Sequence, residues 1–106
     1  MKIVEISLME IICKPVESSA MLTQACSRQH SYHVTGCVSN SDKLFVVLEP
    51  GDDSYRYRFA EFPSFVPEEI SAEIASRYQA GFTTLGSFIA KDKLWGLFAI
   101  AEQTAE

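Results

Sequence analysis

Two stretches of this 106-residue chain repeat one another at a separation of fifty residues. The first is TGCVSNSDKLFVV, which begins at Thr35, and the second is TLGSFIAKDKLWGL, which begins at Thr84. At this separation Gly36 pairs with Gly86, and the tripeptide DKL follows in both stretches. In each, two apolar runs flank a short polar turn, which is the pattern of a β-hairpin. A repeated hairpin favours folds that are built from two copies of one supersecondary unit.

A strand is predicted ahead of each hairpin. Residues 2–13 are rich in Ile, Val and Leu, and their apolar residues alternate with polar ones at the start. The segment SYRYRFAEF has the same period of two, which places Tyr55, Tyr57 and Phe59 on one face. Aligning MEIICKPVES with AEFPSFVPEE, at an offset of 51, places Glu10 over Glu61 in the two halves.

A helix is predicted between each of these strands and its hairpin. The first spans about residues 17–29, and the second begins at Pro67 and is capped by Gly81. Their apolar stripes are Met21, Leu22, Ala25 and Cys26 in the first, and Ile70, Ile74, Ala75 and Tyr78 in the second. The order β-α-β-β therefore occurs twice, in halves of about 1–50 and 51–106 of a single domain. We expect an α+β fold in which the duplicated units form a mainly antiparallel sheet with two helices on one face.

The element order and the matched hairpins TGCVSNSDKL and LGSFIAKDKL resemble the gyrase-inhibitor-like effector-binding family. This resemblance implies tandem strand-helix-strand-strand modules with a groove between them, in which family members hold small hydrophobic or cationic ligands. A ferredoxin-like split unit or another duplicated α+β fold is the alternative.

Composition and charge narrow the class of protein. The net charge of −5 disfavours a nucleic-acid-binding surface, which carries a basic stripe. No apolar run approaches the length of about 18 residues that a membrane span needs. Three cysteines are an odd count and fit free thiols in a reducing compartment, so we expect a cytoplasmic protein.

Four residues have the chemistry of a zinc site but not its spacing: Cys26, His30, His33 and Cys37. In a strand, His33 and Cys37 would lie about 13 Å apart, which is too far for one ion or for a hydrogen bond. We expect no metal and no cofactor, and any role of these four residues beyond packing stays open. The chain has no phosphate-binding loop, dinucleotide fingerprint or Ser-His-Asp order, which favours a binding protein over an enzyme.

Aromatic side chains and carboxylates supply the candidate ligand-binding residues, because together they can hold an organic cation. The candidates are Tyr55, Tyr57, Trp95, Phe45, Glu61 and Glu10. The first hypothesis is a small-molecule binding module with a hydrophobic or cationic ligand. The second is a protein-interaction or inhibitor protein that acts as a homodimer, and a homo-oligomer is expected. An enzyme that uses Glu10 or Glu61 as a base is the third.

Overall fold

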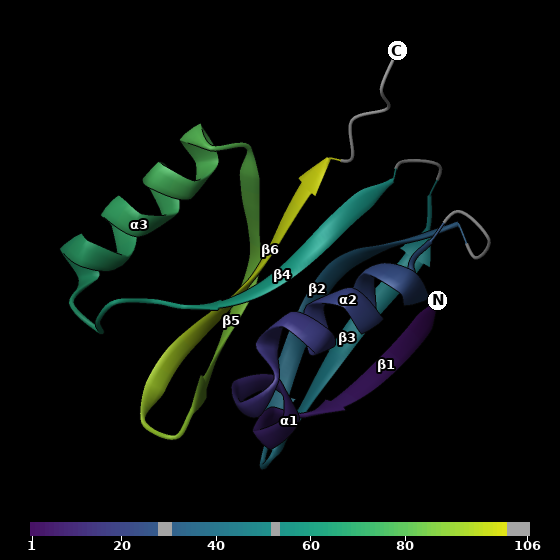
Figure 1. Ribbon diagram of the computed structural model, residues 1–106, viewed down its shortest axis with the longest axis horizontal. Coiled ribbons are helices and arrows are strands. Elements are labelled where there is room, and N and C mark those ends of the chain that lie inside the picture. Colours follow the sequence, from purple (N-terminus) through teal and green to yellow (C-terminus); the bar gives the residue numbers. More distant parts are fainter. Residues whose placement is uncertain (28–30, 52–53, 102–106) are drawn as a thin grey trace.

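The chain combines helices with antiparallel strands, which confirms the predicted α+β fold (Figure 1). The computed structural model describes residues 1–27, 31–51 and 54–101. Its elements in order are β1 (Lys2–Ser7), α1 (Leu8–Cys13), α2 (Pro15–Ala25), β2 (Tyr32–Asn40), β3 (Lys43–Pro50), β4 (Tyr55–Glu61), α3 (Pro67–Gln79), β5 (Phe82–Ala90) and β6 (Lys93–Ala101). In this part of the chain, no helix is both long and apolar enough to cross a lipid bilayer.

The strands form two antiparallel sheets, with the orders β1-β3-β2 and β4-β6-β5, rather than one merged sheet. The two sheets approach each other where β2 meets β5, and a Cβ atom added to Gly86 would lie 2.7 Å from the Cys37 sulfur. A side chain occupies part of the outer edge of β2, because the Val34 N–H donates a hydrogen bond to the Tyr57 hydroxyl. That contact joins β2 of the first sheet to β4 of the second sheet.

The predicted repeat of the hairpins is confirmed. The β2-β3 ladder pairs Gly36 with Val47, and the β5-β6 ladder pairs Gly86 with Leu97. Each ladder has its register shift just before the glycine. The offset of fifty therefore holds for every pair in the two hairpins.

The predicted alignment of the first strands is wrong. Glu5 lies opposite Phe45 and Glu61 lies opposite Trp95, so the counterpart of Glu61 is Glu5 and the offset is 56. The cause is α1, which replaces the second half of the strand predicted over residues 2–13. In α1 the buried side chains are three residues apart, at Leu8 and Ile11, which is helical spacing.

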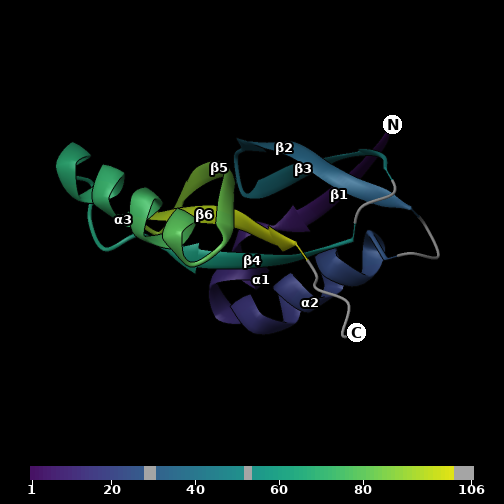
Figure 2. The ribbon, with the colours of Figure 1, turned by 90° about the horizontal axis from the view of Figure 1, so that it is seen from above.

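The two helices of the repeat differ in burial. In α2, Leu22 is fully buried, and this helix packs against β4 of the second module. Helix α3 has the predicted Pro67 start and a Gly81 terminus at φ 97°, yet none of its residues is buried, and Tyr78 is 71% exposed. Figure 2 shows α3 at one end of the molecule, away from α1 and α2.

Candidate functional site

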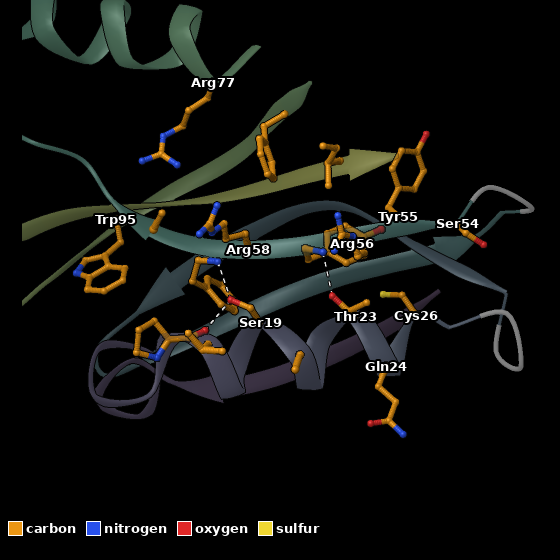
Figure 3. Close-up of a pocket in the computed structure, with 18 of the residues that line it drawn as sticks. Ser19, Thr23, Gln24, Cys26, Ser54, Tyr55, Arg56, Arg58, Arg77 and Trp95 are labelled. Atoms are coloured by element: carbon orange, nitrogen blue, oxygen red, sulfur yellow. Dashed lines mark hydrogen bonds between the residues drawn. The ribbon is translucent and has the colours of Figure 1, made fainter. Parts of the chain in front are cut away.

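A groove of about 1210 Å³ runs along β4 between α2 and the last turn of α3 (Figure 3). Both modules line it, and it exceeds the range of about 300–1,000 Å³ that is typical of small-molecule sites. Four of the six predicted ligand-binding residues lie along it: Tyr55, Tyr57, Glu61 and Trp95. Phe45, on β3, and Glu10, on the exposed surface of α1, are not among its lining residues.

One wall of the groove is built where α2 meets the free edge of β4. The Phe59 N–H donates to the Ser19 hydroxyl over 2.9 Å, and that hydroxyl donates to the Pro15 carbonyl over 2.6 Å. One helical turn later, the Tyr57 N–H donates to the Thr23 hydroxyl over 2.9 Å. These bonds satisfy edge N–H groups that no strand partner covers, and they fix α2 along β4.

Tyr57 and Cys26 meet behind this wall. The Tyr57 hydroxyl accepts the Val34 N–H over 2.9 Å and also bonds the Cys26 side chain. Burial raises the pKa of Tyr57 to about 12 and that of Cys26 to about 11. Both groups are therefore neutral at physiological pH and form part of the supporting structure of the groove.

Three arginines give the groove a cationic lining. Arg56 and Arg58 come from β4, and Arg77 extends from α3 toward them (Figure 3). The Arg58 guanidinium lies 5.9 Å from the Phe82 ring centroid, and that of Arg77 lies 4.5 Å from the Phe98 ring centroid. Such contacts hold guanidinium groups in place over aromatic faces.

The acidic lining residue Glu61 already has a partner. Its carboxylate lies 3.4 Å from the Lys93 ammonium, at the exposed end of the strand. Sequence reasoning did not name the arginines as site residues, because it selected aromatic and acidic side chains that could hold an organic cation. The sequence signal for a cationic lining was the pair Arg56 and Arg58, which alternate with Tyr55, Tyr57 and Phe59 and lie on the other face of β4.

Trp95 lies at one end of the groove and Ser54 at the other (Figure 3). The Trp95 side chain is buried, at 8% exposure, and its indole N–H has no hydrogen-bond partner in the described part of the chain. A buried donor without an acceptor costs about 1–3 kcal/mol. An acceptor atom of a bound molecule would recover that free energy.

The four residues considered for zinc are not assembled into a site. Within residues 1–27, 31–51 and 54–101, no group of three potential ligands lies together. Cys26 is in the core, Cys37 faces Gly86, and His33 lies against Gly51, while His30 is outside the described residues. All three cysteines are free thiols.

Comparison of the chain with protein-family models, with curated proteins and with solved structures finds no match.

Proposed function

We propose that this protein is a small-molecule binding module whose ligand combines an apolar or aromatic body with an anionic group. The observation that carries the proposal is the cationic lining that Arg56, Arg58 and Arg77 give the groove. Trp95, on the other face of the β4-β6 sheet, lines one end of the groove with an unpaired indole N–H. An anionic group supplies acceptor atoms for the guanidinium groups of Arg56 and Arg58, and arginine binds carboxylate and phosphate oxygens in a bidentate manner. Arg77 adds positive charge, although its guanidinium already lies 2.7 Å from the Glu73 carboxylate.

The sequence analysis expected a hydrophobic or cationic ligand. The proposed ligand has the same hydrophobic part but carries a negative charge. Among the described lining residues, a cationic ligand would meet three guanidinium groups, of which that of Arg77 is paired with Glu73, and one carboxylate, which is paired with Lys93. The positive lining also stands out against the net charge of −5 of the whole chain. A groove of one sign in a protein of the other sign attracts an oppositely charged ligand selectively.

Binding is favoured over catalysis because the titratable groups closest to the wall are held neutral. The pKa values of Cys26 and Tyr57 are raised by burial, which is the opposite of what an activated nucleophile requires. The face of Tyr55, Tyr57 and Phe59 is one surface on which a homodimer could form. Tyr57 and Phe59 are 4% and 3% exposed within the chain, so that face is not available to a partner.

The charge of the ligand can be tested with three probes that share one apolar body: 4-phenylbutyrate, 4-phenylbutanol and 4-phenylbutylammonium. The only tryptophan is Trp95, so its fluorescence reports on the groove directly. We expect 4-phenylbutyrate to change the emission saturably, with weaker binding of the alcohol and no binding of the ammonium compound. Equal or tighter binding of the ammonium compound would contradict the proposal, and so would the absence of binding by all three.

Substitution locates the binding of the anionic probe. Arg58→Gln should weaken 4-phenylbutyrate by about tenfold or more, the effect expected for a hydrogen bond to a charged group, and should leave the alcohol unchanged. Lys91→Gln is the matched control, because it removes the same charge from the β5-β6 turn. If both variants weaken the probe equally, the effect comes from net charge and not from the groove.

A further inference from the structure

The contact between α2 and β4 is a template for a second contact in the repeat. Helix α2 runs along the free edge of β4, where the Ser19 hydroxyl accepts the Phe59 N–H and the side chain of Phe59 is buried. Each module contains one such helix and one such strand. The repeat therefore predicts an equivalent contact between α3 and β1.

In the described part of the chain, strand β1 presents the same edge without a cover. The N–H groups of Leu8 and Phe62, just beyond β1 and β4, donate to carbonyls of the neighbouring hairpins over 2.8 Å. Because N–H groups alternate along a strand, those of Ile3 and Phe59 both point to the free edge. The Ile3 side chain is 53% exposed whereas that of Phe59, its counterpart, is 3% exposed.

Helix α3 carries the matching surface. When the helices are aligned on their first prolines, Ser71 takes the place of Ser19 and Ile74 takes the place of Leu22. Both residues of α3 are exposed. Thirteen helical residues and six strand residues each extend over about 20 Å, so the lengths of α3 and β1 agree.

The two surfaces cannot meet within one chain in the observed arrangement. Helix α3 packs on β5, and Figures 1 and 2 both place α3 and β1 toward opposite ends of the molecule. We propose that α3 of one copy packs along β1 of a second copy and that the contact is reciprocal, which gives a two-fold dimer. In this dimer the Ser71 hydroxyl accepts the Ile3 N–H of the other chain, and Ile74 covers the Ile3 side chain.

The repeat supports a second copy as the occupant, because α3 and β1 are the counterparts of α2 and β4. Val16 of α2 and Arg58 of β4 both line the groove. The counterpart of Val16 in α3 is Glu68, and the counterpart of Arg58 in β1 is Lys2. The sequence of β1, KIVEIS, is neutral overall, and its Glu5 is already paired with Lys43. Ala75 stands where α2 has Thr23, so the dimer has one hydroxyl acceptor fewer than the template and should be weaker than the internal contact.

The contact can be trapped by a disulfide between two different chains. Ile3→Cys and Ser71→Cys are placed in separate chains, each with Cys13→Ser to remove the exposed native thiol. The 2.9 Å bond in the template brings the equivalent Cα atoms into the range that a disulfide bridges. Oxidation of the mixed chains should give a covalent heterodimer, and replacing Ser71→Cys by Glu69→Cys, on another face of α3, should not.

Two further measurements decide between arrangements. Sedimentation of the unmodified protein should show a concentration-dependent monomer–dimer equilibrium, which Ile3→Glu abolishes and Met21→Glu, on the exposed surface of α2, leaves intact. The proposal is overturned if the mixed chains form no specific bridge, if an Ile3→Cys/Ser71→Cys chain closes on itself at high dilution, or if sedimentation shows larger open-ended assemblies.

Discussion

The two modules share a hairpin and differ in the helix that accompanies it. Helix α2 is fixed between its own module and β4, with Leu22 fully buried and Ser19 bonded to the strand edge. Helix α3 has a similar start but no buried residue. A repeat in sequence therefore does not specify equal burial, because burial depends on which neighbour each copy meets.

The largest contrast is expected for the apolar residue at the centre of each helix. Leu22→Ala should lower the free energy of unfolding by about 2–5 kcal/mol, since it removes a fully buried side chain. Ile74→Ala should lower it by about 0.5 kcal/mol or less when the protein is diluted to the monomer. Urea unfolding measures both, and similar losses would show that α3 is buried as deeply as α2.

The next contrast concerns the last turn of each helix, where Cys26 is buried and its counterpart Tyr78 is exposed. The pKa of Cys26 rises from 9.0 to about 11, and that of Tyr57 rises from 10.0 to about 12, because burial disfavours their anions. Above pH 9 the unfolded chain loses these protons first, so the contribution of these two groups to stability is constant below about pH 9 and is lost from there to about pH 12.

The two groups are hydrogen-bonded to each other, so their contributions to this loss of stability do not simply add. Guanidinium unfolding from pH 8 to 11 should show this decline. Cys26→Ala should reduce it, whereas Cys13→Ala, at an exposed position, should leave it unchanged. An unchanged decline in Cys26→Ala would place the titration elsewhere.

The two serines of the helices give a smaller contrast. Ser19→Ala should cost about 1–3 kcal/mol, because it leaves the Phe59 N–H without its acceptor in a buried position. Ser71→Ala should have almost no effect on the monomer and should weaken the dimer. Unfolding at low protein concentration and sedimentation at high concentration separate the two effects, and a large loss of monomer stability in Ser71→Ala would contradict the assignment.

The sequence predicted the features that are set locally and missed those set by tertiary contacts. The hairpins could be aligned because the glycine and the turn lie within one ladder. The strand over residues 2–13 was predicted too long, because Ile11 and Ile12 are β-branched residues that favour strands. The helical spacing of Leu8 and Ile11 extends over only a six-residue helix. Tyr55 and Tyr57 were found from the alternating aromatic residues of β4, and Glu61 and Trp95 from the repeat, but Arg77 comes from α3, whose position no local pattern gives.

The smallest effect is expected where the modules agree most closely. Glu5 pairs with Lys43, and Glu61 pairs with Lys93, at equivalent positions of the two ladders. All four side chains are about half exposed, so each ion pair contributes little. Glu5→Gln and Glu61→Gln should shift the midpoint of thermal unfolding by similar small amounts, and 1 M salt should remove both shifts, because the screening length is then about 3 Å. If one substitution is clearly more costly than the other, the two ends of the repeat are not equivalent in energy, although their ladders match residue for residue.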